Sequence, residues 1–279
     1  MQPFSLNLKG RLKEFSRPAV MGIVNVTPDS FYAGSRVNTD ADIEARAAAM
    51  IEQGADFLDI GAYSSRPGAN EVPLEEEWRR LKLGIVAVRR VAGSDMPVSV
   101  DTFRAEIARR AVEEGADIIN DISGGNLDDD MFATVAALRV PYILMHMRGT
   151  PATMQGLTEY DGNVACAVAA ELSAPLRRLE EAGVADIIVD PGFGFAKTME
   201  QNWELARDLS TLEILNRPLL AGISRKSMLT RLLDIGSDKA LAATTALNLT
   251  LLERGAAILR VHDVTEARQA VAIYTAISS

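Results

Sequence analysis

Eight short apolar segments alternate with longer amphipathic stretches along this chain, and that alternation limits the folds open to it more than any other feature. The apolar segments are residues 19–25, 57–62, 97–102, 117–122, 141–146, 186–190, 219–224 and 256–262. Most show little polar–apolar alternation, which is typical of parallel strands buried on both faces. Helical patterns lie between them, for example 40–53, 74–91 and 163–181.

Four glycines mark where helices should end. Gly54, Gly115, Gly183 and Gly255 each follow a helical pattern and stand just before an apolar segment. A glycine in that position commonly closes a helix, because it adopts a left-handed conformation without steric cost. The pattern therefore indicates strand and helix in regular alternation.

Eight strands alternating with helices over 279 residues, with no linker or break in composition, predict one (β/α)8 TIM barrel. A doubly wound open sheet is the main alternative. We expect a single domain over residues 1–279, with the barrel in 19–279. Residues 1–18 should form a short N-terminal β-hairpin, turning at Lys9 and Gly10, that closes the bottom of the barrel.

Composition excludes several classes of protein. Residues of the apolar classes make up 48% of the chain, but no apolar run approaches the roughly 20 residues of a membrane helix. The first fifteen residues lack the apolar core of a signal peptide. Cys166 is the only cysteine, which excludes an internal disulfide, and we expect it to pack within a helix. We therefore expect a cytoplasmic protein, and the net charge of −9 argues against nucleic acid or anionic membranes as partners.

Polar or charged side chains follow nearly every predicted strand at its carboxyl end, where barrel enzymes place their active sites. They are Asn25, Asp101, Thr102, Asn120, Asp121, His146, Asp190, Ser224, Arg225, Lys226, Ser227, Arg260, His262 and Asp263. Each has a structural explanation as well. Asp101 could cap the next helix, Asp190 could start a turn, and Arg260 could pair with Asp263 on the surface.

The chemistry of this set indicates a ligand. Asp101, Asn120 and Asp190 suit a flat heterocycle with amino and ring N–H donors, and Lys226 suits its carbonyl or ring nitrogen. Arg66, Arg260 and His262 form a second, basic group that suits an anion beside the heterocycle. His146 and His262 are the only histidines, which excludes a multi-histidine zinc site, and His146 is better explained as a pocket-wall or structural residue than as a ligand.

An ordered set of motifs identifies a resemblance. They are MGIVNVTPDSF, SSRPGA, SVDT, GADIINDISGG, MHMRGTPATMQ, DPGFGFAKT, GISRKS and RVHDV, spread over residues 21–264. Together they resemble dihydropteroate synthase, of the pterin-binding TIM-barrel family. The reaction implied joins 4-aminobenzoate to the methylene group of (7,8-dihydropterin-6-yl)methyl diphosphate, giving 7,8-dihydropteroate and diphosphate in folate biosynthesis.

The resemblance implies a role for each matched residue. Asp101, Asn120, Asp190 and Lys226 would hold the pterin. Asn25, Arg66, Arg260 and His262 would line the diphosphate site, with Asn25 a ligand of Mg²⁺, the one cofactor implied. Ser65, Arg66, Pro67, Phe193, Lys226 and Ser227 would form the 4-aminobenzoate site. The catalytic residues implied are Asp101, Lys226, Arg260 and His262, acting in an SN1-like displacement in which the diphosphate leaves first.

Three positions depart from the family pattern. Tyr63 replaces a glutamate, Ser65 replaces a threonine, and Ala196 stands where glycine is common. These changes bear on affinity for 4-aminobenzoate and its sulfonamide mimics. The family likeness also implies a homodimer. A methyltetrahydrofolate:corrinoid methyltransferase would share the pterin residues but would not need Asn25 or the Arg260–His262 pair. A non-catalytic pterin-binding protein is the other alternative.

Overall fold

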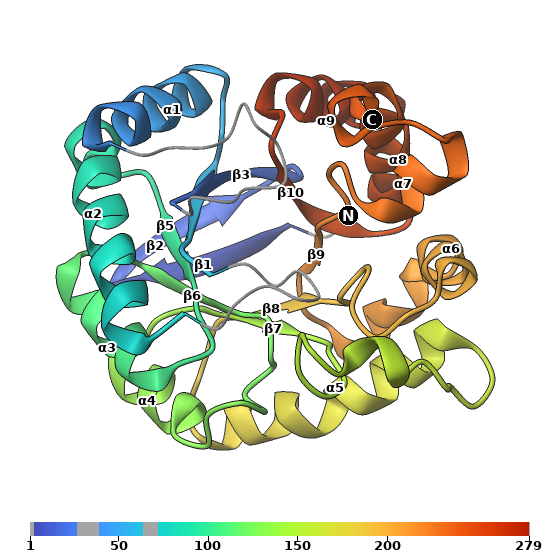
Figure 1. Cartoon of the computed structure of the whole chain (residues 1–279), viewed down its shortest axis with the longest axis horizontal. Helices are drawn as coiled ribbons and strands as arrows, with labels where there is room; N and C mark the ends of the chain where they lie inside the picture. Colours follow the sequence, from blue (N-terminus) through green and yellow to red (C-terminus); the bar gives the residue numbers. More distant parts are fainter. Residues whose placement is uncertain (1–2, 27–38, 64–71, 279) are drawn as a thin grey trace.

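The structure is a computed structural model that describes residues 3–26, 39–63 and 72–278. Eight parallel strands close into a barrel in the order β10-β3-β4-β5-β6-β7-β8-β9 (Figure 1). They are β3 (Ala19–Asn25), β4 (Phe57–Gly61), β5 (Val98–Asp101), β6 (Ile118–Asp121), β7 (Tyr142–Met145), β8 (Ile187–Asp190), β9 (Leu219–Ala221) and β10 (Ala256–Val261). The predicted barrel is confirmed, and closure through the β10–β3 and β9–β10 pairs excludes the open sheet.

Helices surround the barrel as an outer ring (Figure 1). They are α1 (Asp40–Glu52), α2 (Leu74–Ala92), α3 (Ala105–Glu114), α4 (Met131–Leu138), α5 (Val164–Glu181), α6 (Met199–Arg207), α7 (Ser227–Leu233), α8 (Leu241–Glu253) and α9 (Val264–Ser278), with 3-10 turns η2 (Met154–Gly156), η3 (Leu209–Leu215) and η4 (Ser237–Lys239). Gly54, Gly115, Gly183 and Gly255 all have φ between 90° and 127° at helix ends. The predicted helix ends are therefore confirmed.

The strands bury both faces, as their sequences predicted. Outward side chains such as Val20 and Leu58 belong to the large core between the barrel and the helices. Inward side chains such as Met21, Phe57 and Ile188 form a separate core inside the barrel. Successive strand residues point to opposite faces, so each strand contributes to both cores in turn.

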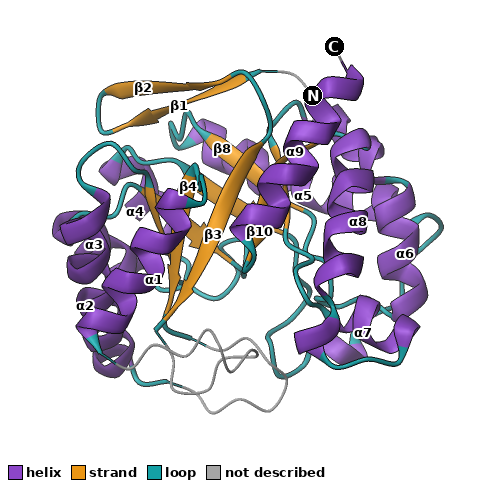
Figure 2. Ribbon diagram, turned by 90° about the horizontal axis from the view of Figure 1, so that it is seen from above, coloured by secondary structure: helices purple, strands orange, loops and turns teal. Residues whose placement is uncertain are grey.

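The N-terminal hairpin closes one end of the barrel. Strands β1 (Phe4–Leu8) and β2 (Arg11–Phe15) pair antiparallel and lie across the barrel end (Figure 2). Lys9 and Gly10 form the turn with φ of 53° and 86°, as a two-residue hairpin turn requires. Leu6, Leu8 and Phe15 are buried against the interior core of the barrel. The predicted hairpin and its position at the bottom of the barrel are confirmed.

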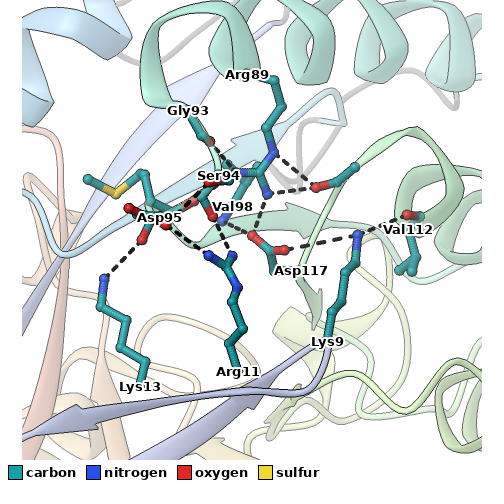
Figure 3. Close-up of polar contacts among 12 residues, drawn as sticks. Lys9, Arg11, Lys13, Arg89, Gly93, Ser94, Asp95, Val98, Val112 and Asp117 are labelled. Carbon is teal, nitrogen blue, oxygen red and sulfur yellow. Dashed lines mark hydrogen bonds and ion pairs between the residues drawn. The ribbon is translucent and has the colours of Figure 1, made fainter.

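Three basic side chains of the hairpin also hold it to the barrel (Figure 3). Lys9 Nζ donates to Val112 O at 3.2 Å and lies 4.0 Å from Asp117 Oδ1. Arg11 Nη1 binds Asp95 Oδ1 at 2.8 Å, and Lys13 Nζ donates to Asp95 O at 3.3 Å. These exposed contacts individually stabilise the fold little, so the buried apolar side chains of the hairpin provide most of its attachment.

One expectation about packing is wrong. Cys166 lies in the first turn of α5 and is exposed, because this helix buries Val164, Ala165 and Val168 instead.

No helix among the described residues is both long enough and apolar enough to cross a membrane.

Candidate active site

The barrel interior changes from apolar to polar along each strand. Two positions beyond inward-facing Phe57, Ile118, Ile188 and Ile258 stand Asp59, Asn120, Asp190 and Arg260. Inward positions recur every second residue, so these four side chains must form the next layer toward the carboxyl ends of the strands. The barrel therefore has an apolar floor beneath a layer of hydrogen-bonding groups.

Arg260 is the centre of that layer. Its Nε donates to Asp59 Oδ2 at 2.7 Å and its Nη2 to Asp101 Oδ2 at 3.2 Å. Asn120 Nδ2 donates to the same Asp59 oxygen at 3.2 Å. The prediction of a basic group separate from the acceptors is therefore wrong, because the guanidinium lies among them. The alternative surface pair with Asp263 is also wrong, since Asp263 binds Arg225 at 2.8 Å.

Asp101 is held in an environment that disfavours its charge. Burial is the main cause that raises its pKa to about 7, with a further contribution from the charge of Asp59 and an opposing one from Arg260. It does not cap α3, whose first residue Ala105 is instead bound through its amide by Asp128 Oδ2 at 2.7 Å. The capping alternative is therefore wrong, and the Asp101 carboxylate remains available to a ligand.

Asp190 reaches the same layer from β8. A Cβ on Gly222 would lie 3.9 Å from both Asp190 Oδ2 and Arg260 Cβ, so the two side chains flank this glycine. Asp190 Oδ1 also accepts from Gly192 N at 2.7 Å, so the predicted turn is present as well. Burial raises the pKa of Asp190.

Lys226 approaches from the segment after β9. It is half-buried, and its Nζ donates to Phe193 O and lies 5.0 Å from the centre of the Phe195 ring. Burial lowers its pKa to about 8, although the charge of Asp190 opposes that shift. The lysine is therefore still mainly protonated at neutral pH, beside a carboxylate and an aromatic face.

The predicted aromatic wall of the 4-aminobenzoate site needs correction. Phe193 is 0% exposed and belongs to the core between barrel and helices, so its side chain offers no surface to a ligand. Phe195, two residues further, is half-buried beside Lys226 and packs with Met145, Met147 and Ile122 above the barrel. Gly194 lies between the two phenylalanines with a φ of 84°, and the backbone turn there directs their rings into different cores.

His262 lies after β10, at the edge of the same layer. Its Nδ1 is 3.0 Å from Ser224 Oγ, which accepts from His262 N at 3.3 Å. Burial, with a smaller effect from the charge of Arg260, lowers its pKa to about 4. It is therefore neutral at pH 7 and would meet an anion as a hydrogen-bonding imidazole.

Asn25 ends β3 close to Asp101. A Cβ on Gly61 would lie 3.5 Å from Asn25 Oδ1 and 3.9 Å from Asp101 Oδ2. Among residues 3–26, 39–63 and 72–278, no group of three His, Cys, Asp or Glu side chains could hold a metal ion. One amide oxygen beside a carboxylate fits a Mg²⁺ ion that takes most of its ligands from substrate oxygens and water.

The structure describes some of the remaining predicted site residues and not others. Ser227 is the exposed first residue of α7, directly after Lys226. Tyr63 is half-buried and its ring meets Phe103 edge-on at 5.1 Å. Ser65, Arg66 and Pro67 lie outside the described residues.

His146 has the structural role expected of it. It is 4% exposed, and its Nε2 lies 2.9 Å from Glu171 Oε2.

Two buried charged residues near the site were missed from the sequence. Asp59 is fully buried, and the sequence did indicate it, because it is the single acidic residue within the apolar run FLDIGA. Lys197 is 4% exposed, and nothing in the sequence indicated its burial, because a lysine after a glycine-rich turn is typical of a solvent-exposed position.

Comparison with known proteins accounts for this arrangement. The family model described as pterin binding enzyme matches residues 21–262. The dihydropteroate synthase of Synechocystis is 45% identical over 251 residues, covering 89% of this chain and 86% of its own length. The crystal structure of Yersinia pestis dihydropteroate synthase in a sulfonamide drug complex superposes with a TM-score of 0.93 at 36% identity, over 99% of each chain. The solved structure of Xanthomonas albilineans dihydropteroate synthase in complex with 7,8-dihydropteroate gives a TM-score of 0.85 at 37% identity, also over 99% of each chain. With this coverage and identity, the chain belongs to the pterin binding enzymes and, among them, to the dihydropteroate synthases.

Proposed function

We propose that this chain condenses (7,8-dihydropterin-6-yl)methyl diphosphate with 4-aminobenzoate, giving 7,8-dihydropteroate and diphosphate. The observation that carries the proposal is the polar layer, by which we mean the hydrogen-bonding groups that lie above the apolar floor of the barrel. Two carboxylates, an amide and a lysine converge at one end of a barrel whose relatives are dihydropteroate synthases.

The pterin would lie on the polar layer. Asp101, Asn120 and Asp190 supply acceptors for its amino and ring N–H groups, and Lys226 supplies a donor for its carbonyl or ring nitrogen. Arg260 is already oriented by Asp59, so its planar guanidinium can support the ring without further ordering.

4-Aminobenzoate would bind next to Lys226. Phe195 replaces Phe193 as the aromatic wall we propose, because its ring lies beside the lysine ammonium. Ser227, at the first turn of α7, would receive the carboxylate, where backbone N–H groups are unpaired. Ser65, Arg66 and Pro67 stay predicted members of this site.

The diphosphate would lie between Asn25, Arg260 and His262, with Arg66 a further predicted contact. Mg²⁺, held by Asn25 and substrate oxygens, would supply electrostatic stabilisation of the leaving group. Arg260 adds a fixed positive charge, and neutral His262 donates a hydrogen bond. These groups act where negative charge develops, which is the most effective place for electrostatic catalysis.

We propose that the diphosphate leaves before the amine attacks. Departure of the diphosphate leaves a methylene cation that the electron-rich pterin ring stabilises, with Asp101 close to it. The nitrogen of the weakly basic arylamine then attacks the methylene carbon, and the proton it loses passes to the departed diphosphate or to water. The attack needs no strong general base, so the Ser224–His262 contact at 3.0 Å is not required as a nucleophile with its activating base.

The corrinoid methyltransferase alternative is not favoured, because the relatives that cover nearly the whole chain are dihydropteroate synthases. A non-catalytic role is tested by activity. Diphosphate release by purified protein with the dihydropterin diphosphate and Mg²⁺ should require 4-aminobenzoate or be strongly accelerated by it, with dihydropteroate formed. Pterin binding without turnover would support a non-catalytic protein.

The assembly and location we propose are a homodimer and the cytoplasm. A groove between α8 and α9, lined by Leu241, Leu249, Ala270 and Ile273 among others, supports an interface on this side of the barrel. Leu232 and Leu233 of neighbouring α7 are 59% and 50% exposed. Light scattering at micromolar concentration should give twice the chain mass of 30.1 kDa, and a monomer would contradict the dimer.

A further inference from the structure

The loop between β8 and α6 is fixed through its carbonyl groups by side chains from three directions. Lys197 Nζ donates to Gly192 O at 3.0 Å and to Phe195 O at 3.1 Å. Lys226 donates to Phe193 O, and Tyr160 OH to Ala196 O at 3.0 Å. Nothing in the proposed chemistry requires Lys197, yet it is more buried than Lys226.

The number of hydrogen-bond acceptors around Lys197 equals the number of N–H donors on its ammonium group. Its third contact is His146 Nδ1 at 3.0 Å, so three acceptors surround a group with three N–H donors. His146 then carries its proton on Nε2, which donates to Glu171 Oε2 at 2.9 Å. The result is a chain of hydrogen bonds from the half-exposed Glu171 of α5 to the interior of the loop.

We propose that Lys197 is a positioning residue for the substrate site, holding the loop 191–196 so that Phe195 lies beside Lys226 and Gly192 N binds Asp190. Two of its acceptors, Gly192 O and Phe195 O, belong to the residues that make those contacts. The effect of Lys197 on the binding of 4-aminobenzoate rests on the proposed function, whereas its effect on the position of the loop does not.

The protonation of Lys197 controls this arrangement. A neutral amine has two donors instead of three, so one of the three acceptors loses its partner when the proton leaves. Burial lowers the pKa of Lys197 to about 7. The charged groups that face it are Asp190 of β8, Glu171 of α5, Arg148 after β7 and Lys226 after β9. Asp190 and Glu171 favour the protonated form, while Arg148 and Lys226 oppose it.

Two variants test the proposal against a matched control. Lys197→Met keeps the length of the side chain but removes all three donors. Glu171→Gln still accepts from His146 but removes a charge that favours protonated Lys197. Glu180→Gln removes a comparable carboxylate on the same helix, paired there with Arg217. The three variants and the parent protein are compared in kcat and in KM for 4-aminobenzoate between about pH 6 and 9.

Lys197→Met should raise KM for 4-aminobenzoate roughly tenfold or more, with a smaller change in kcat and a weaker pH dependence of KM. Glu171→Gln should move the alkaline rise in KM to lower pH, whereas Glu180→Gln should leave the profile unchanged. Titration of Lys226, whose pKa shift does not involve Glu171, would not respond in this way. A profile unmoved by Glu171→Gln, or an unchanged KM in Lys197→Met, would overturn the proposal.

Amide hydrogen exchange and ¹⁵N NMR of lysine Nζ give a readout that needs no activity. Exchange of Gly194 and Phe195 should be faster in Lys197→Met, and the Nζ titration of Lys197 should move to lower pH in Glu171→Gln. If the parent protein is inactive, the proposed function fails while these measurements still decide the role of Lys197. Unchanged exchange and titration would reject it.

Discussion

Arg260 of β10 reaches past β3 to Asp59 of β4, where its Nε donates to Asp59 Oδ2 at 2.7 Å. Asp59 is fully buried and Arg260 is 21% exposed, so the pair joins the interior of the barrel to its mouth. The guanidinium is therefore oriented before any ligand arrives. It also holds Asp101 at 3.2 Å, which couples the acid that we assign to the pterin to a fixed positive charge.

Substituting Asp101 should separate ligand binding from stability. The pKa of Asp101 is about 7 in the folded chain, compared with 3.8 for an unperturbed aspartate, so the folded state holds the extra proton. Its contribution to stability falls as pH rises between those values, because ionising the buried group opposes folding. Asp101→Asn should therefore raise the melting temperature more at about pH 8 than at about pH 5.

The same variant should bind the pterin roughly tenfold to a hundredfold more weakly, because a charged acceptor is lost. Calorimetry and thermal unfolding at the two pH values check both parts. Asp95→Asn is the control, since Asp95 is 93% exposed. An equal change in melting temperature at both pH values would show that Asp101 has an ordinary pKa.

Lys226→Ala should weaken pterin binding by roughly tenfold or more, because it removes the one ammonium that we assign to the pterin. Calorimetry with a dihydropterin is the measurement. Lys82→Ala, at a lysine 54% exposed on α2, should leave the affinity as it is. Unchanged affinity in Lys226→Ala would remove this residue from the pterin site.

The two phenylalanines of the loop should respond differently to truncation. Phe193→Ala should destabilise the fold by about 3 to 5 kcal/mol, because its side chain is fully buried. Phe195→Ala should cost less stability and should mainly raise KM for 4-aminobenzoate. Denaturant unfolding and steady-state kinetics of both variants distinguish the rings. An unchanged KM in Phe195→Ala would mean that residues other than Phe195 form the wall of the 4-aminobenzoate site.

Asn25→Ala should impair the steps that involve diphosphate and leave binding of the free pterin largely intact. The amide is the one protein ligand that we propose for Mg²⁺, so the dependence of rate on Mg²⁺ should shift to higher concentration. Rates across a Mg²⁺ titration and calorimetry with a pterin lacking diphosphate provide the comparison. Equal loss of both would indicate a structural role for Asn25.

Ala196→Gly should stabilise the fold. Ala196 has a φ of 50°, a left-handed conformation that costs a residue with a Cβ about 1 to 2 kcal/mol. Glycine removes that cost but loses more entropy on folding, so a net gain of about 0.5 to 1 kcal/mol is expected. Chemical denaturation measures it, with Gly183→Ala, at φ 90°, as the opposite change. A loss of stability in Ala196→Gly would show that the alanine methyl packs favourably enough to outweigh its backbone strain.

The barrel could be predicted from the sequence because its signals are local. Apolar runs, helical periodicity and glycines at helix ends each depend on neighbours in the chain, and the eight strands and the turn at Lys9 and Gly10 followed from them. The ends of the strands also indicated where Asp101, Asn120, Asp190 and Arg260 would gather, since parallel strands bring their carboxyl ends together.

The tertiary structure alone decided how those side chains pair. The salt bridge from Arg260 to Asp59 joins residues 201 positions apart, and no local pattern specifies such a contact. The same limit applies to Phe193 and Phe195, which have similar sequence surroundings but lie in different cores because the turn at Gly194 directs each ring. Lys197 is the clearest case. Its sequence context is that of a surface lysine, and only the acceptors supplied by the folded loop and by His146 make its burial possible.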